Sequence, residues 1–453
     1  MGSLTYEAAL AELRERGRFG IRLGLGRTRA LLRELGDPQA AFKGALIGGT
    51  NGKGSVLALV SSVLRAAGLR AGETPKPHLV TYRERLQIAG RLVDPTAFAR
   101  LVEAVLPAAD RVARRHGQPT EFELLTAVAY RWFADQAVDL AIVEVGLGGR
   151  LDATHAWDGG VAAITNVDLD HMDRLGSTIS AIAREKAAII ERGDLAVTGA
   201  SGDGLVVIRR RATRLAVPLK IVRPVPLLGW DRDGISVELA GLGETRIGLR
   251  GRHQAANAAV ADGVLDALAE AGIASVSPAA RRAGYGSASW AGRLELIEPS
   301  SSFGREVLLD GAHNPAGAAV LAQALDDLRP FLAGGADRLP PPLTLIVGMM
   351  ADKDVAGVVK ALSASRALAG ATVICTEVDA PRALPAEALA RLWAAADSRF
   401  RTVVVRPSRA AIDAARTGAP GPVVVAGSLY LIGAIRALLV DDPALRDVAG
   451  SGG

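Results

Sequence analysis

The chain has 453 residues, of which 49% are hydrophobic and 4% aromatic, and its formal net charge at pH 7 is +5. This length exceeds one ordinary hydrophobic core, so we expect at least two domains, and the composition excludes a disordered or fibrous protein. Basic residues are scattered, and the short run Arg209–Arg211 is typical of a solvated helix face, so we expect no nucleic-acid binding.

The cysteine content and the hydropathy of the sequence indicate the cellular compartment of the protein. The single cysteine, Cys375, excludes a disulfide framework and favours a reducing, cytoplasmic location. No run of about 18 uncharged apolar residues occurs, and the N-terminus lacks the apolar core of a signal peptide. We therefore expect neither a membrane span nor secretion.

Residues 40–225 alternate between predicted strands and predicted helices. After a helical lead-in, apolar runs predict strands at 40–49, 138–146, 161–167, 195–200 and 219–222. Amphipathic patterns predict helices at 54–68, 177–190 and 204–216, the second with Ser177 or Thr178 as its N-cap. This alternation is typical of an α/β fold with a parallel, doubly wound sheet.

The pattern changes at about residue 225. Residues 227–251 alternate apolar and polar side chains around the turn Asp233-Gly234, which predicts a small antiparallel sheet; we expect it to pack against the edge of the first domain. A long helix follows at 253–272, and strand–helix alternation restarts near residue 296. We predict a nucleotide-binding domain over 1–295 and a second, smaller Rossmann-like α/β domain over 296–453.

The strongest local signal is a glycine-rich turn between the first predicted strand and its helix. Glycines permit close backbone approach, the helix N-terminus binds phosphate oxygens, Lys53 offsets their charge, and Ser55 can ligate Mg²⁺. This phosphate loop differs from the common pattern by an extra glycine between the lysine and the serine. It predicts nucleotide binding, and its residues are Gly49, Thr50, Asn51, Gly52, Lys53, Gly54 and Ser55.

Two further polar residues follow predicted buried strands. Glu144 ends one strand, at the edge where open α/β sheets bind ligands, and a buried carboxylate needs a partner such as a metal ion. His171 follows the next strand and is a candidate for the same ion. The residues alone also allow a buried histidine at this position, with its ring nitrogens hydrogen-bonded within the protein.

Ten segments resemble the folylpolyglutamate synthase/dihydrofolate synthase family of the Mur ligase superfamily, in the family's order and over nearly the whole chain. These segments are GGTNGKGS, PHLVTYRERLQIAG, EFELLT, EVGLGGRLDAT, ITNVDLDHMDRLGSTISAIAREKAAII, LRGRHQAANAAVA, WAGRLELI, LLDGAHNPAG, GMMADKD and AGSLYLIGAIR.

The resemblance implies a ligase that uses ATP to join a pteroate or folate carboxylate to L-glutamate through an acyl phosphate. The implied substrates are dihydropteroate or a reduced folate, L-glutamate and ATP. The implied cofactors are ATP and Mg²⁺, with two ions expected, and K⁺ is a further candidate. We expect a monomer.

The resemblance also implies roles for individual residues. The implied metal ligands are Ser55, Glu144, His171 and a carbamylated Lys186, and the implied ATP contacts are Asn257, Arg293 and Asp310. The implied catalytic residues are Lys53, Lys186, Asp310 and His313. The implied folate or glutamate contacts are Phe122, Glu123, Asp152, Ala153, His313 and Ser428. From the residues alone, purely structural roles stay open: a surface ion pair for Lys186, a structural contact for Asn257, and a helix N-cap for Asn314.

The sequence departs from the family pattern at two informative positions. Lys76 stands where the family has a serine that contributes to a Mg²⁺ site, and an ammonium group does not ligate a metal. Thr74 is a candidate replacement. His155 stands where the family has asparagine. We expect these departures to affect metal or pterin binding.

Two other functions remain open from the sequence. The first is a Mur-superfamily ligase that acts on another carboxylate, although only 48 residues precede the phosphate loop, which leaves no room for the usual N-terminal domain of such enzymes. The second is a non-catalytic nucleotide-binding protein. Release of ADP that requires both a pteroate and glutamate would separate all three.

Overall fold

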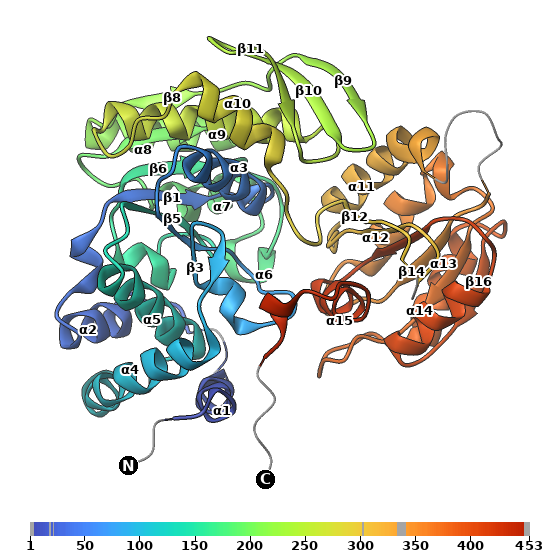
Figure 1. Ribbon diagram of the computed structural model, residues 1–453, viewed down its shortest axis with the longest axis horizontal. Coiled ribbons are helices and arrows are strands. Elements are labelled where there is room, and N and C mark those ends of the chain that lie inside the picture. Colours follow the sequence, from blue (N-terminus) through green and yellow to red (C-terminus); the bar gives the residue numbers. More distant parts are fainter. Residues whose placement is uncertain (1–3, 18–19, 21, 301–302, 333–340, 448–453) are drawn as a thin grey trace. The chain divides into compact units, whose positions relative to one another are not determined.

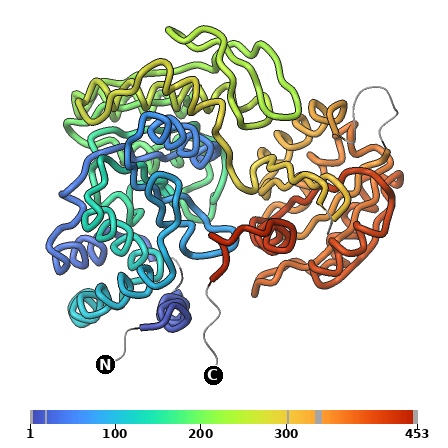
Figure 2. Tube along the Cα trace, viewed as in Figure 1, coloured from blue at the N-terminus to red at the C-terminus, as the bar shows by residue number. Residues whose placement is uncertain are grey.

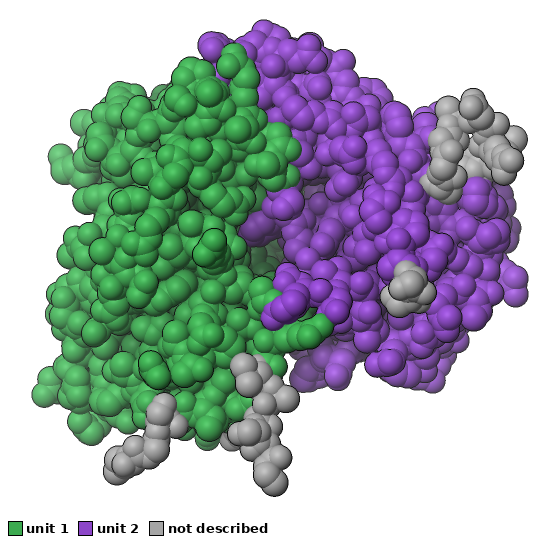
Figure 3. All heavy atoms as spheres, in the orientation of Figure 1, with its two compact units in different colours: residues 1–225, 256–288, 444–453 green, residues 226–255, 289–443 purple. Residues whose placement is uncertain are grey.

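The computed structural model describes residues 4–17, 20, 22–300, 303–332 and 341–447 (Figures 1 and 2). The chain forms two compact units, coloured separately in Figure 3. Unit 1 comprises residues 1–225, 256–288 and 444–453, and unit 2 comprises residues 226–255 and 289–443. The predicted domain boundary between residues 295 and 296 stays a prediction.

Unit 1 is built on an eight-stranded sheet, ordered β4-β3-β2-β5-β1-β6-β7-β8. Its strands β5, β1, β6 and β7 are parallel and mostly apolar, as expected for strands covered on both faces, and β2 pairs with β5 in parallel although it contains Glu73 and Thr74. The short strands β3 and β4 add an antiparallel edge. The strands are β1 (Gly44–Gly48), β2 (Ala71–Thr74), β3 (Gln87–Ile88), β4 (Arg91–Leu92), β5 (Leu140–Glu144), β6 (Gly160–Ile164), β7 (Leu195–Thr198) and β8 (Leu219–Ile221).

Helices cover this sheet and bury its apolar residues. The core contains an aromatic cluster around Phe42, Tyr130, Phe133 and Trp157. Of the two predicted N-caps, Thr178 accepts from the backbone N–H of Ala181 at 3.2 Å. The helices are α1 (Tyr6–Gly17), α2 (Gly26–Glu34), α3 (Lys53–Ala66), α4 (Pro95–His116), α5 (Glu121–Asp135), α6 (Met172–Leu175), α7 (Ile179–Ala187), α8 (Gly202–Leu215), α9 (Gln254–Glu270), whose first two residues belong to unit 2, and α10 (Pro278–Ser287).

Unit 2 contains two sheets. Strands β9 (Leu227–Asp231), β10 (Gly234–Leu239) and β11 (Gly243–Ile247) form the predicted antiparallel sheet. The turn between β9 and β10 is Arg232-Asp233, one residue before the predicted Asp233-Gly234, because Gly234 pairs with Asp231. The larger sheet has the order β12-β13-β17-β14-β15-β16 and is parallel except for β12. Its strands are β12 (Glu295–Ile297), β13 (Val307–Leu309), β14 (Thr344–Val347), β15 (Thr372–Cys375), β16 (Arg401–Val404) and β17 (Val423–Ala426).

The predicted fold class is confirmed, with one difference in detail. The antiparallel sheet belongs to unit 2 and not to the first domain, because the Arg232 guanidinium at its hairpin forms ion pairs with Glu298 and Glu306 beside the larger sheet. The helices of unit 2 are α11 (Pro315–Leu328), α12 (Val355–Ser363), α13 (Ala386–Ala396), α14 (Ser408–Thr417) and α15 (Leu429–Leu439). No helix in the described part of the chain has the length and apolar character to cross a membrane.

Candidate active site

The phosphate loop joins β1 to α3, as predicted, and its glycines are required by its geometry. Gly52 has a φ of +81°, and a Cβ added there would lie 2.3 Å from the Asn257 Oδ1 atom. Gly49 has a φ of +142°, and its Cβ would lie 1.8 Å from the Thr165 Oγ1 atom. Only glycine fits either position. The same contacts place Asn257 of α9 directly against the loop.

The loop is also fixed to the end of β6. The Asn51 N–H donates to Asn166 Oδ1 at 2.9 Å, and Thr50 Oγ1 donates to the Asp168 carbonyl at 3.2 Å. The Lys53 Nζ atom donates to the carbonyls of Gly49 and Thr50, both at 3.1 Å. These contacts hold the backbone N–H groups at the start of α3 in an arrangement suited to phosphate oxygens.

Glu144 lies at the same edge of the sheet as the loop, because β5 pairs with β1 in parallel and Glu144 is in register with Ile47. Its side chain is buried, and Oε2 accepts the Lys76 backbone N–H at 2.9 Å. Ser55, at the start of α3, is buried as well. These two oxygen donors suit a hard cation that completes its coordination with water and nucleotide phosphate, as Mg²⁺ usually does.

His171 is more exposed than the other predicted metal ligands. It precedes α6 with a φ of +49°, its side chain is 43% exposed, and its Nε2 atom lies 3.8 Å from Asp170 Oδ2. Within the described residues, no three His, Cys, Asp or Glu side chains form a metal-binding group. A cation at this edge would therefore depend on ligands such as the Ser55 hydroxyl and phosphate oxygens.

Lys186 is buried, which contradicts the alternative that it forms a surface ion pair. Its Nζ atom donates to the Gly49 carbonyl at 2.8 Å, so α7 brings it to the base of the phosphate loop. Burial lowers the pKa of this amine to about 7, helped by the positive charge of Lys53 and opposed by Asp170. A substantial fraction of the amine is therefore neutral near neutral pH.

Lys76 lies beside Glu144, on the loop that follows β2. Its Nζ atom donates to the Glu144 carbonyl at 2.5 Å and lies 5.0 Å from the centroid of the Phe122 ring. Burial lowers the pKa of Lys76 to about 8, while the negative charges of Asp152 and Glu144 oppose this shift. The nearby Lys53 charge acts in the same direction as burial.

A small cavity opens next to Lys76 and Phe122. Its volume is about 10 Å³, which is room for about one water molecule. Four aromatic or aliphatic side chains, three threonines and two cationic side chains line it. The lining residues are Thr74, Lys76, Arg85, Phe122, Leu125, Thr126, Ala129, Tyr130 and Thr154.

Two of the predicted substrate contacts have structural roles. The Glu123 carboxylate is buried, closes a capping box with Thr120, and accepts from Arg27 Nε at 3.0 Å. The buried Asp152 carboxylate accepts from the Leu147 N–H at 2.8 Å and from the Thr154 N–H at 3.0 Å. Of the residues predicted for the pterin side, Phe122 lines the cavity and Glu123 does not.

Ala153 and His155 lie on the short helix η3 (Ala153–Ala156), and both are buried. The His155 Nε2 atom lies 3.1 Å from Glu191 Oε1, and Nδ1 lies 3.4 Å from the Arg150 carbonyl. The histidine that departs from the family pattern therefore connects η3 to the loop between α7 and β7, and it does not line the cavity.

In unit 2, the predicted residues gather at the carboxyl ends of β13 and β17. Asp310 accepts from the Leu294 and Ala312 N–H groups, both at 2.9 Å; burial raises its pKa, and the Arg293 charge opposes this. The Arg293 side chain lies against Gly311, where an added Cβ would be 2.6 Å from Nη1. This brings Arg293 and Asp310 together.

The neighbouring residues of this cluster have backbone partners. The His313 Nδ1 atom lies 2.7 Å from the Gly311 carbonyl. Asn314 caps α11 by accepting from the Gly317 N–H at 2.7 Å, which confirms the helix-cap interpretation. Ser428 is buried and caps α15. Burial and the Arg293 charge lower the pKa of His253 to about 4, so this side chain is neutral at pH 7.

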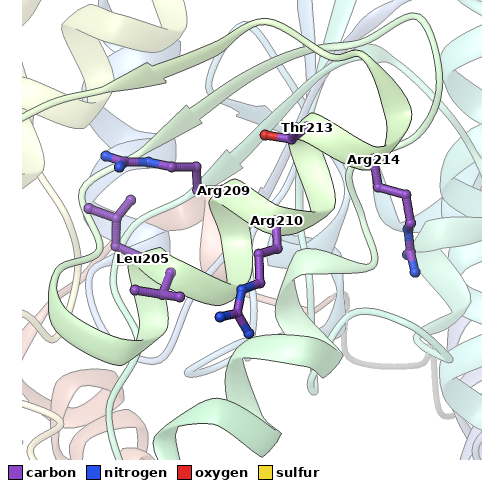
Figure 4. A pocket seen from close by; sticks show the side chains of 6 residues that line it. Leu205, Arg209, Arg210, Thr213 and Arg214 are labelled. Carbon is purple, nitrogen blue, oxygen red and sulfur yellow. The ribbon is translucent and has the colours of Figure 1, made fainter.

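A second surface hollow lies on α8, away from these residues in the sequence (Figure 4). It is lined by Leu205, Val206, Arg209, Arg210, Thr213 and Arg214. Arg209 and Arg210 are exposed, whereas Arg211 turns inward and donates to the Ile190 carbonyl at 2.9 Å. The solvated-face interpretation of this arginine run therefore holds for two of its three residues.

The sequence did not indicate several residues that hold the phosphate loop or line the cavity. Thr165 and Asn166 fix the phosphate loop, and Tyr130 and Arg85 line the cavity. Asn166 had a usable signal, since it is one of only four asparagines in the chain. Arg85 lies within the family segment PHLVTYRERLQIAG, whereas Tyr130 lies outside all ten segments.

Two known domain families together match most of the chain. Residues 47–210 match the Mur ligase middle domain, and residues 292–429 match the Mur ligase glutamate ligase domain. The dihydrofolate synthase/folylpolyglutamate synthase of Mycobacterium tuberculosis is 35% identical over 471 residues, covering 92% of this chain and 90% of the relative. The folylpolyglutamate synthase of Lacticaseibacillus casei is 34% identical, covering 90% and 93%.

Solved structures give the same match. Folylpolyglutamate synthase of Mycobacterium tuberculosis, complexed with ADP and AMPPCP, superposes with a TM-score of 0.83 at 32% identity, covering 97% of this chain and all of that one. E. coli FolC in complex with DHPP and ADP superposes with a TM-score of 0.79 at 28% identity, covering 95% and 97%.

Proposed function

The chain belongs to the folylpolyglutamate synthase/dihydrofolate synthase family of Mur ligases, and on this premise we propose that it forms an amide between a pteroate or folate carboxylate and L-glutamate at the expense of ATP. The observation that carries this proposal is the grouping of the phosphate loop, Glu144, Lys186 and Asn257 at one edge of the unit 1 sheet.

The first step transfers the γ-phosphoryl group of ATP to the acid. The backbone N–H groups at the start of α3 and the Lys53 ammonium hold the β- and γ-phosphates, while Asn257 positions the nucleotide from α9. A carboxylate oxygen of the acid attacks the γ-phosphorus, ADP leaves, and an acyl phosphate forms. The chain contributes mainly orientation and charge stabilisation to this step.

The second step forms the amide. The glutamate amine attacks the acyl carbon, the amine loses a proton, and inorganic phosphate leaves with the oxygen that came from the acid. We assign glutamate and phosphate contacts in unit 2 to Arg293, Asp310, His313 and Ser428. Arg293 supplies a fixed cation, and the half-buried Asp310 orients the loop that carries His313. Excluding water at this stage protects the acyl phosphate from hydrolysis.

Ser55 and Glu144 would hold Mg²⁺ in this proposal, with His171 as a further ligand. When bound, Mg²⁺ supplies positive charge that neutralises the phosphates. We assign a second Mg²⁺ ion to Lys186 in its carbamylated form, since the buried amine lies at Gly49 and a carbamate would provide oxygen ligands. K⁺ is a further cofactor candidate, which replacement of K⁺ by Na⁺ in the assay would test.

A product assay tests the function. The chain is supplied with ATP, Mg²⁺ and glutamate, with either dihydropteroate or a reduced folate, and amide products are identified by mass spectrometry. We expect product with at least one of the two acids and no ADP release when the acid is omitted. Running the acids separately decides whether one or both folate reactions occur. ADP release without an amide product would contradict the proposal.

A variant pair ties this activity to the phosphate loop. Lys53→Ala removes the cation that stabilises the transferred phosphoryl group, so the rate should fall by roughly a hundredfold or more. Lys43→Ala removes an exposed lysine just before β1 and should leave the rate unchanged. An unaffected rate in Lys53→Ala would remove the loop from the mechanism.

The proposal includes a cytoplasmic monomer. The only cysteine of the chain, Cys375, is buried as a free thiol in β15, which suits a reducing compartment. Sedimentation equilibrium at several concentrations measures the mass directly. A mass of twice the 46.9 kDa of one chain would exclude the monomer.

A further inference from the structure

The Lys76 ammonium uses few of its hydrogen-bond donors within the described part of the chain. The Lys76 ammonium has three N–H donors. Among the residues that the structure describes, only the Glu144 carbonyl accepts from it, at 2.5 Å. Two donors therefore remain for a ligand.

The position of this ammonium favours an aromatic acid as the ligand. Lys76 lines the small cavity whose wall includes the Phe122 ring and the buried Tyr130. The Tyr130 hydroxyl is already used, because it donates to the Thr154 carbonyl at 2.8 Å. The half-buried Phe122 ring thus offers an apolar surface next to the positive charge and free donors of Lys76.

The surroundings also place Lys76 near the reacting phosphate. Its backbone N–H donates to the Glu144 carboxylate at the end of β5, next to β1 and the phosphate loop. Its ammonium lies within electrostatic range of Lys53. A carboxylate bound to Lys76 would therefore lie close to the γ-phosphate held by Lys53.

We propose that Lys76 binds the reacting carboxylate of the acid substrate and is a specificity-determining residue of this chain; this inference rests on the proposed function. Lys76 holds the carboxylate by one or two charge-assisted hydrogen bonds while the aromatic part of the acid packs against Phe122. The positive charge also favours the ionised acid over neutral analogues.

Binding of a matched ligand pair tests this assignment. The affinities of dihydropteroate and of its carboxamide are measured by titration calorimetry on the full chain with AMPPCP and Mg²⁺ present. A charge-assisted hydrogen bond is lost with the carboxamide, so the wild-type chain should prefer the acid by roughly tenfold to a hundredfold. Lys76→Met should bind the acid as weakly as the carboxamide, with its carboxamide affinity unchanged.

Three further variants keep the test interpretable. Lys76→Gln can still donate to the Glu144 carbonyl, so it preserves the loop without the charge and should also lose the preference. Lys76→Arg should retain part of it, and Lys43→Met, at an exposed lysine, should retain all of it. AMPPCP affinity within about twofold of wild type shows that a variant is folded.

The outcomes separate the two claims. If Lys76→Met and Lys76→Gln weaken both ligands equally, or if they keep the preference for the acid, the assignment of Lys76 is wrong although the proposed function stands. If the wild-type chain binds neither ligand and forms no amide, both the proposed function and the assignment are wrong.

Discussion

Lys186 shows how the environment of one side chain changes its chemistry. Burial among the residues at the base of the phosphate loop removes water from the amine, so the charged form becomes less favourable. Because only a neutral amine reacts with CO₂, such a site is suited to carbamate formation. The Gly49 carbonyl at 2.8 Å fixes the amine where a carbamate oxygen could face a metal ion.

Carbon NMR tests the carbamate. In a solution equilibrated with ¹³C-labelled bicarbonate and Mg²⁺, the wild-type chain should show a carbamate carbon signal, and Lys186→Met should not. Lys43→Met, which removes an exposed lysine, should keep the signal. A wild-type spectrum without this signal would leave Lys186 as an amine that donates to the loop.

Glu73 is a buried carboxyl outside the active site that makes stability depend on pH. Its side chain lies on β2, accepts from the Gly90 N–H at 3.0 Å, and is nearly inaccessible. Burial raises its pKa from 4.5 to about 7, although the Arg65 charge opposes this. The folded chain therefore binds this proton more tightly than the unfolded chain does, and stability falls as the pH rises from 4.5 to about 7.

The variant Glu73→Gln removes this titration. Relative to wild type, it should gain unfolding free energy between pH 4.5 and pH 8, by up to roughly 3 kcal/mol for a pKa rise of this size. Urea unfolding at the two pH values measures the difference. A difference between the two proteins that is the same at both pH values would show that the Glu73 pKa is not raised in the folded chain.

The strand, turn and helix that form the phosphate loop depend on glycine at Gly52. A side chain there would both strain the left-handed backbone and collide with Asn257 Oδ1. We expect Gly52→Ala to lower ADP affinity at least about tenfold and to cost about 1–2 kcal/mol of stability.

The opposite end of the same helix offers a matched control. Gly68 follows α3 with a φ of +79°, close to that of Gly52, but an added Cβ would meet nothing within 4 Å. Gly68→Ala should therefore lose a similar stability and keep its ADP affinity, as titration calorimetry would show. Equal affinity in both variants would mean that the Gly52 geometry is not needed for nucleotide binding.

At the level of elements, the sequence predicted the long apolar strands and the helices between them, because burial on both faces produces continuous apolar runs. It did not indicate β2, β3 or β4. These strands are two to four residues long and contain Gly, Glu, Gln and Arg, so their pairing depends on tertiary contacts rather than on a local pattern. Helix α4 was also missed, and it has Pro107 in its interior.

The site residues also include some that the sequence predicted correctly and some that it did not. The phosphate loop was predicted correctly as the turn between a strand and a helix, since glycine spacing and flanking elements together specify its geometry. Glu123 and Asp152 matched family segments equally well, but their carboxylates are used by neighbouring backbone N–H groups. A matching motif does not reveal whether a side chain faces a ligand or its own backbone; only the packing decides this.

For the whole molecule, the chain order of elements indicated two α/β sheets, and both are present. What the sequence left open is how the chain divides between the compact units, because that depends on contacts such as the ion pairs of Arg232. Each unit carries its own set of polar residues at the carboxyl ends of its parallel strands. In the proposed reaction, unit 1 binds the acid and most of the nucleotide, and unit 2 supplies the glutamate and phosphate contacts of Arg293, Asp310, His313 and Ser428.

The most direct test of this account follows one oxygen atom. Dihydropteroate or a reduced folate labelled with ¹⁸O in its reacting carboxylate is incubated with the chain, ATP, Mg²⁺ and glutamate. If the carboxylate attacks the γ-phosphorus and the amine then displaces phosphate, each amide formed releases one inorganic phosphate that carries one ¹⁸O atom. Unlabelled phosphate, label in AMP, or ADP release without an amide would contradict the account.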